Sequence, residues 1–200
     1  MQNMRTSFMC LFFLCLFSML RAQDTTTLTN NALRFADSLM KASYVEDWNT
    51  YSALTNYSAI KYYGGPESFK EHAKMVYYRI ERKEDEKREK LRMVQLMNDG
   101  TDQWQCVIEK ERNTYVDSRK VKLIAYIIGQ SMDNGENWKF VDIAHNSTEN
   151  IIFIMPALFS KIAVPPGKML YEDEMLAAQQ QQAAPAPKPK TKTNTTGKKK

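Results

Sequence analysis

The chain of 200 residues has few of the side chains that mark a catalytic or metal centre. It contains three cysteines and two histidines, and Cys10 and Cys15 lie in an N-terminal apolar run. Cys106 is the only thiol after that run, which excludes an internal disulfide there and leaves stability to packing. No acid pair accompanies His72 or His145 at ligand spacing, so we expect no metal site and no cofactor. A glycine-rich phosphate loop and a Gly-x-Ser-x-Gly elbow are absent too.

The sequence also lacks a net positive charge outside its two terminal segments. The net charge of +5 is the sum of six lysines within residues 177–200, the two arginines Arg5 and Arg21, and a remainder whose net charge is −3. Domains that follow a nucleic-acid backbone carry a concentrated positive face. We therefore expect no nucleic-acid partner.

The N-terminal segment has the pattern of a signal peptide. Arg5 precedes an uncharged apolar run of 13 residues, Phe8–Leu20, and the small residue Ala22 stands just before Gln23. A membrane-spanning helix needs about 20 apolar residues, so this run is short. We predict a signal peptide over residues 1–22, cleavage near Ala22, and export to the periplasm or the extracellular space. A retained membrane anchor is the alternative, because a short anchor can tilt or thin the bilayer.

The C-terminal segment, residues 177–200, consists mainly of glutamine, alanine, proline, threonine and lysine. Such a composition cannot pack a core, and it predicts a disordered tail. Its lysines could instead hold the protein to an anionic membrane or to cell-wall polymer.

Between these segments, residues 23–176 are predicted to form one domain of helices followed by an antiparallel sheet. Asp99-Gly100 and Asn134-Gly135 are strong turn signals. They separate four expected strands, Leu91–Met97, Trp104–Arg112, Arg119–Gln130 and Trp138–His145. Before them we expect a helix from Thr29 or Asn30 to about Ser43, an amphipathic stretch Val45–Leu54, a short strand Tyr57–Tyr63 and a helix that starts at Pro66. A solvated charge run, Glu81–Lys90, leads into the sheet, and Ile151–Val164 is expected to form short helical turns that cover an edge or end of it.

This order of elements carries a resemblance to a known superfamily. Together with Tyr62-Tyr63-Gly64-Gly65-Pro66-Glu67-Ser68-Phe69 and Gly135-Glu136-Asn137-Trp138-Lys139-Phe140-Val141-Asp142, it resembles the nuclear transport factor 2-like superfamily, which includes SnoaL-like and ketosteroid-isomerase-like domains. The resemblance covers roughly residues 28–146. It implies an α+β, cystatin-like fold in which a cone-shaped, curved antiparallel sheet wraps around N-terminal helices, with a pocket at the open end and frequent dimers. The fold does not fix a reaction.

Strand alternation assigns the two faces of the sheet. The expected inner face carries Trp104, Cys106, Ile108, Leu123, Ala125, Ile127, Trp138, Phe140 and Asp142. The outer face carries Lys120, Lys122, Lys139 and His145, interleaved with Ile124, Tyr126, Ile128, Val141 and Ile143. These outer apolar residues form a patch that a second subunit could cover, which predicts a homodimer.

The candidate pocket-lining residues are Asp142, Tyr63, His72, Trp104, Phe140 and Trp138. Asp142 is a carboxylate on an apolar face, where burial raises a carboxylate pKa and can prepare a general acid or base. The interpretation that we favour is a structural one, in which Asp142 caps a helix or bonds a tyrosine hydroxyl near the mouth of the cone. The neighbouring inner positions Leu123, Ala125 and Ile127 offer it no polar partner, which argues against acid–base chemistry.

We therefore predict an exported, non-catalytic binding protein whose apolar pocket takes a small ligand or a protein partner. One alternative is a proton-transfer isomerase or dehydratase that uses Asp142, assisted by Tyr63 or His72. Another is an envelope interaction module held by its basic tail. Cys106, which is followed by Val107 and Ile108, is interpreted as a core residue and not as a nucleophile.

Overall fold

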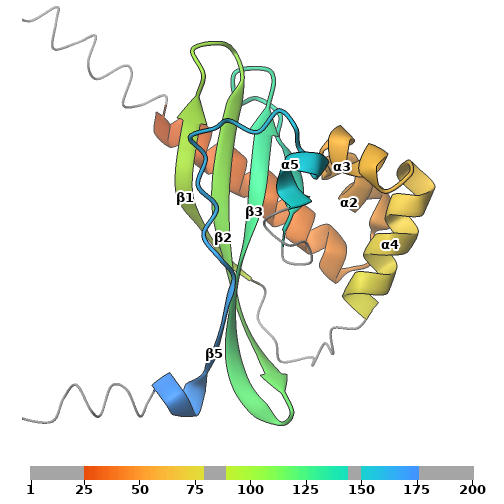
Figure 1. Cartoon of the computed structure of the whole chain (residues 1–200), viewed down its shortest axis with the longest axis vertical. Helices are drawn as coiled ribbons and strands as arrows, with labels where there is room; N and C mark the ends of the chain where they lie inside the picture. The colour runs from red at the N-terminus through yellow and green to blue at the C-terminus, as the bar shows by residue number, and fades with distance from the viewer. Residues whose placement is uncertain (1–24, 79–88, 144–149, 176–200) are drawn as a thin grey trace, which may run out of the picture.

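The computed structural model describes residues 25–78, 89–143 and 150–175 (Figure 1). Four sequence predictions fall wholly or mostly outside these ranges: the signal peptide, the charge run, the outward position of His145 and the disordered tail. All four stay predictions.

The described residues of the N-terminal half form four helices. Residues 25–44 form the first, and α2 (Trp48–Leu54), α3 (Tyr57–Tyr62) and α4 (Pro66–Tyr78) follow it. Asp47 caps α2 by accepting a hydrogen bond from the Thr50 amide, and Pro66 opens α4 as the sequence predicted. None of the described helices is both long and apolar enough to cross a membrane.

Three local predictions in this half are wrong. The first helix already includes residue 25, so neither Thr29 nor Asn30 caps it. The expected strand Tyr57–Tyr63 is the helix α3, because the Asn56 side chain accepts a hydrogen bond from the Ser58 amide and starts a helical turn. Val45 is 61% exposed in the turn before α2, so it does not share that helix's buried face.

The predicted antiparallel meander is confirmed, with longer central strands. The strands β1 (Lys90–Asn98), β2 (Trp104–Val116), β3 (Arg119–Ser131) and β4 (Lys139–Asp142) lie in the order β1-β2-β3-β4. β2 and β3 run past β1 and β4 as a long hairpin (Figure 1). A fifth strand, β5 (Lys168–Tyr171), pairs with the hairpin along residues 121–124 of β3, and the sequence analysis did not predict it.

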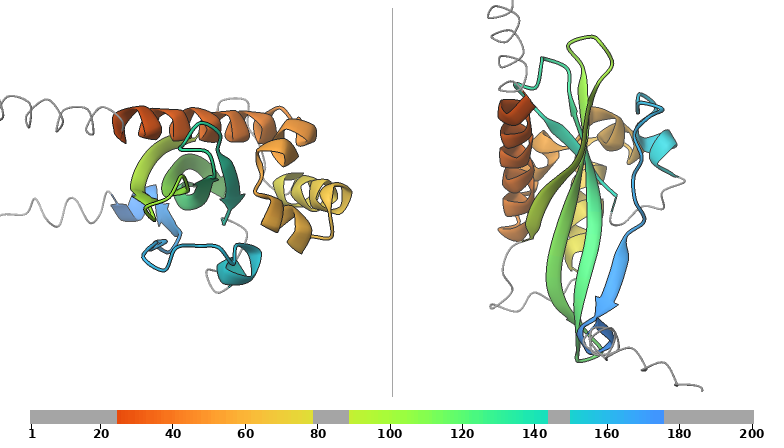
Figure 2. Two further views of the ribbon diagram at one scale, coloured as in Figure 1. Left: turned by 90° about the horizontal axis from the view of Figure 1, so that it is seen from above. Right: turned by 90° about the vertical axis from the view of Figure 1, so that its left-hand side faces the viewer.

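The sheet curls strongly, so that the fold is α+β with a half-barrel sheet, as the sequence predicted. Seen from above, the helix of residues 25–44 lies on one side of the curl, the C-terminal segment lies on the other, and α2 to α4 group at one edge (Figure 2). The inner face packs on the helices in a core that includes Ala36, Leu39, Cys106, Ile108, Ile127, Trp138 and Phe140. The predicted inward direction of Phe140 and Trp138 is confirmed, since both side chains are fully buried.

The outer apolar face is covered by the chain itself. Val107, Tyr126, Ile128, Val141 and Ile143 pack against Ile151, Ile154 and Met155 in and after α5 (Ile151–Ile154). The expectation of an exposed patch over these strands is therefore wrong, because the C-terminal segment occupies that position. The homodimer stays a prediction, but these residues no longer support it.

Two glutamines hold the C-terminal strap, residues 157–163, across this outer face. The Gln105 amide donates to the Ala157 carbonyl (2.7 Å) and accepts from the Phe159 amide (2.8 Å). Gln95 makes the same pair of bonds with the Lys161 carbonyl and the Ala163 amide, each at 3.1 Å. Each side chain thus satisfies two backbone groups that are two residues apart, as a neighbouring strand would.

Gly129 makes the tight curl of the sheet possible. A Cβ atom at this position would lie 2.6 Å from the Cys106 Sγ and 2.8 Å from the Phe140 ring. Both neighbours are fully buried and cannot withdraw freely. The side chains of Cys106 and Phe140 therefore pack closely over Gly129 on the inner face of the sheet.

Candidate functional site

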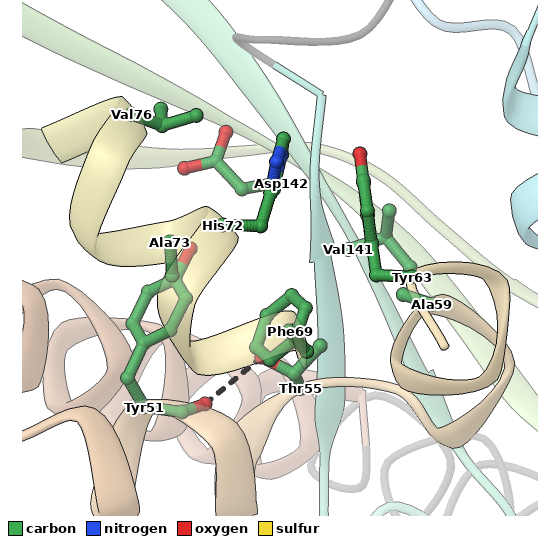
Figure 3. Close-up of a pocket in the computed structure, with 10 residues that line it drawn as sticks. All are labelled: Tyr51, Thr55, Ala59, Tyr63, Phe69, His72, Ala73, Val76, Val141 and Asp142. Atoms are coloured by element: carbon green, nitrogen blue, oxygen red, sulfur yellow. Dashed lines mark hydrogen bonds between the residues drawn. The ribbon is translucent and has the colours of Figure 1, made fainter. Parts of the chain in front are cut away.

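A narrow cleft lies between α4 and β4, and residues in or next to α2 and α3 also line it (Figure 3). Its walls are mostly apolar and aromatic. The lining residues are Tyr51, Thr55, Ala59, Tyr63, Phe69, His72, Ala73, Val76, Val141 and Asp142. The free volume is about 30 Å³, which is close to the volume of one water molecule.

The Asp142 carboxylate, which lines this cleft, forms an ion pair with the Lys110 ammonium. Lys110 belongs to β2 and Asp142 to β4, and β3 runs between them. Their side chains are only 8% and 5% exposed. Two opposite charges thus neutralise each other inside a largely apolar interior, where an unpaired charge would be strongly unfavourable.

Sequence reasoning missed Lys110 because it looked for a partner on the adjacent strand alone. The signal was present in the alternation of β2, where Lys110 has the same parity as Cys106 and Ile108 and must share their inner face. The inference that Asp142 has no polar partner is therefore wrong. The partner is a cation from one strand further away.

His72 and Tyr63 form one wall of the cleft as an aromatic pair. Their ring centroids are 4.1 Å apart and the planes are inclined by 21°. Burial lowers the pKa of His72 below its ordinary value of 6.5, because water is removed from around the charged imidazolium. The imidazole is therefore neutral near pH 7 and stacks as an uncharged ring.

We expect this burial to make the fold acid-sensitive. The unfolded chain binds the His72 proton more tightly than the folded chain, so the free energy of unfolding falls as pH drops below about 6.5. A His72→Gln variant should lose less stability than the wild type between about pH 7.5 and about pH 5, measured by urea unfolding at each pH. An equal loss in both proteins would show that His72 has the same pKa in the folded and unfolded states. His145 is present in both proteins and cancels in the comparison.

The other three candidate residues do not line the cleft. Trp138 and Phe140 are fully buried in the inner core, and the Trp138 indole donates to the Gly135 carbonyl (3.0 Å). Trp104 packs against the same core at partial burial, and its indole nitrogen has no hydrogen-bond partner among the described residues. The structure thus brings Asp142, Tyr63 and His72 together and places the remaining three in the packing that supports them.

Cys106 is enclosed in the inner core. Burial raises the pKa of its thiol to about 12, so the nucleophilic thiolate is not formed near neutral pH. Within the described ranges, no group of three or more histidine, cysteine, aspartate or glutamate side chains is placed to hold a metal ion.

The chain was compared with known proteins at the levels of family, sequence and structure. No family model, curated protein or solved structure matches it. The architecture, an α+β fold with a curled antiparallel half-barrel sheet, is compatible with a nuclear transport factor 2-like fold.

Proposed function

We propose that this chain is an exported, non-catalytic binding protein of nuclear transport factor 2-like type, and that the cleft between α4 and β4 takes a small apolar group. That group is carried either by a free ligand or by a side chain of a protein partner. The export part of the proposal depends on the sequence of residues 1–22.

The chemistry of the cleft is the observation that carries this proposal. Its walls are the apolar or aromatic side chains of four elements. The one carboxylate in its lining, Asp142, is already neutralised by Lys110. Apolar clefts with a small number of fixed polar groups are the usual form of ligand sites. The small free volume favours a short group inserted from outside over a ligand that is enclosed entirely.

An isomerase or dehydratase is the second candidate, because Asp142, Tyr63 and His72 do line the same cleft. Two features of the structure weigh against it. A substrate must place its reacting carbon beside the carboxylate, and about 30 Å³ is roughly a tenth of the smallest common ligand pocket. A proton taken up by Asp142 would also leave the buried Lys110 without its counter-charge.

Site-specific photo-crosslinking tests the binding proposal and distinguishes the two sources of the group. A diazirine amino acid is placed at Val76, which lines the cleft, or at Met75, which is 52% exposed and does not line it. Each protein is irradiated in the cells that express it and its mass is measured. A small mass adduct or a protein adduct at Val76, with none at Met75, supports the proposal and shows which source applies. Equal adducts at both positions, or none at Val76, contradict it.

Attachment to the envelope through the C-terminal tail and formation of a homodimer are parts of the proposal that depend on the sequence alone. If the lysines of residues 177–200 attach the protein to an anionic envelope, deletion of this segment should release it into the soluble fraction at moderate salt. A protein that fractionates identically without the segment would exclude that role.

A further inference from the structure

A second, larger depression lies on the other side of the helices α2 and α3. Its volume is about 430 Å³, which is within the range of small-molecule sites. The lining residues are Asn49, Ser52, Ala53, Thr55, Tyr57, Ile60, Pro66, Lys70 and Lys139. We call this depression the lysine groove. Thr55 is the only residue that it shares with the cleft described above.

Two lysines from different elements line the lysine groove. Lys70 comes from α4 and Lys139 from β4. The Lys139 ammonium donates to the Ala53 carbonyl of α2, another lining residue of the groove. The Lys70 ammonium pairs with Glu67 at 2.8 Å. An ammonium has three donors, so each lysine retains donors for a further acceptor.

The lining of the groove includes two lysines, and Glu67, the carboxylate paired with Lys70, lies outside that lining. Among the described residues, no carboxylate lines it. Glu67, the partner of Lys70, has an 86% exposed side chain, so the ion pair is screened by solvent and readily exchanged. Lysine is a point charge that suits carboxylate and phosphate oxygens.

The remaining walls suit the organic part of a ligand. The Tyr57 side chain is 76% exposed although it belongs to a helix that is packed against the body. An exposed tyrosine ring offers a flat apolar face and a polar hydroxyl. Asn49 and Ser52 add side chains that can donate or accept hydrogen bonds.

We propose that the lysine groove is a binding site for a small organic anion, with a carboxylate or phosphate held by Lys70 and Lys139 and a ring placed on Tyr57. The same anion could belong to a soluble metabolite or to a lipid headgroup. This site is independent of the cleft between α4 and β4, and its occupation does not depend on the function proposed for that cleft.

Titration with phenyl phosphate, followed by amide chemical shifts, tests the proposal on the purified protein. The largest shifts are expected in residues 49–57 and 66–70. A Lys70→Gln/Lys139→Gln variant should bind at least about tenfold more weakly, because each lysine contributes a charge-assisted hydrogen bond. The matched control is Lys41→Gln/Lys168→Gln, which makes the same change in net charge at exposed positions outside the groove. Thermal unfolding checks that both variants are folded.

The outcomes distinguish specific binding in the lysine groove from non-specific attraction of an anion to surface lysines. Equal weakening in the control variant, or shifts centred outside the groove, would overturn the proposal. Tyr57→Ser should weaken phenyl phosphate but leave inorganic phosphate unchanged, and equal effects on both would exclude the ring contact. Co-sedimentation with vesicles that contain phosphatidylglycerol tests whether the anion belongs to a lipid headgroup. Co-sedimentation that is lost in the Lys70/Lys139 variant but kept in the control assigns the anion to a headgroup, whereas binding of phenyl phosphate alone assigns it to a soluble ligand.

Discussion

Replacing Lys110 with methionine should lower the free energy of unfolding by about 3–5 kcal/mol, because the Asp142 carboxylate is then buried without a counter-charge. The two side chains are 8% and 5% exposed, so solvent cannot take over the role of the missing ammonium. Equilibrium urea unfolding measures the loss directly. Methionine keeps the unbranched stem of the lysine side chain and lacks only its terminal ammonium, so the loss reports chiefly the missing charge.

The double variant Lys110→Met/Asp142→Leu shows whether the lost stability comes from the missing ion pair or from the carboxylate that is left buried and unpaired. Buried ion pairs can often be exchanged for apolar residues of similar volume at little cost in stability. We expect the double variant to recover most of the stability lost by Lys110→Met alone. Lys120→Met is the matched control, since Lys120 pairs with Glu172 at the exposed hairpin and should change stability by no more than about 1 kcal/mol. A double variant no more stable than Lys110→Met would show that the ion pair itself holds β2 to β4.

The same double variant bears on the role of the pair in the cleft. A stable protein of this kind retains the aromatic walls and loses only the two charges. If photo-crosslinking at Val76 persists in this variant, the bound group is recognised by its apolar part. If it is lost, Asp142 and Lys110 are polar contacts of the ligand, and their burial serves recognition.

The parts of this fold that follow from local periodicity could be read from the sequence. Alternation along β2, β3 and β4 placed Cys106, Ile127 and Phe140 on the inner face, and the turn glycines at 100 and 135 separated the strands. Both signals depend only on near neighbours in the chain. Asp142 and His72 line one cleft from the strand and the helix on which the sequence placed them, whereas Tyr63 reaches it from the end of α3 and not from the expected strand.

The parts that depend on long-range pairing could not be read in this way. The Lys110–Asp142 pair spans two strands, and alternation alone does not reveal which inner positions meet. The aromatic and β-branched residues of Tyr57–Tyr63 favour a strand, but the Asn56 side chain caps a helix there. β5 and the C-terminal strap have no regular pattern of their own, because partners on β1, β2 and β3 hold them.

Replacing Gln105 with alanine should lower the free energy of unfolding by about 2–3 kcal/mol, because two hydrogen bonds and the packing of a fully buried side chain are lost together. The Gln105 side chain is 0% exposed and bonds both Ala157 and Phe159. Gln95→Ala is the matched control. It removes an equivalent pair of bonds that are exposed to solvent, so the expected loss is below about 1 kcal/mol.

Amide hydrogen exchange locates the effect within the strap. In the Gln105→Ala variant the Phe159 amide should exchange faster, while the Ala163 amide, which Gln95 holds, should keep its protection. If both amides lose protection together, the strap is released as one unit and uncovers Val107, Ile128 and Val141. Sedimentation would then show concentration-dependent association of the variant, because an exposed apolar face of a sheet is a site of self-association. A monomeric variant with a fully exchanging strap would mean that α5 alone protects the outer face.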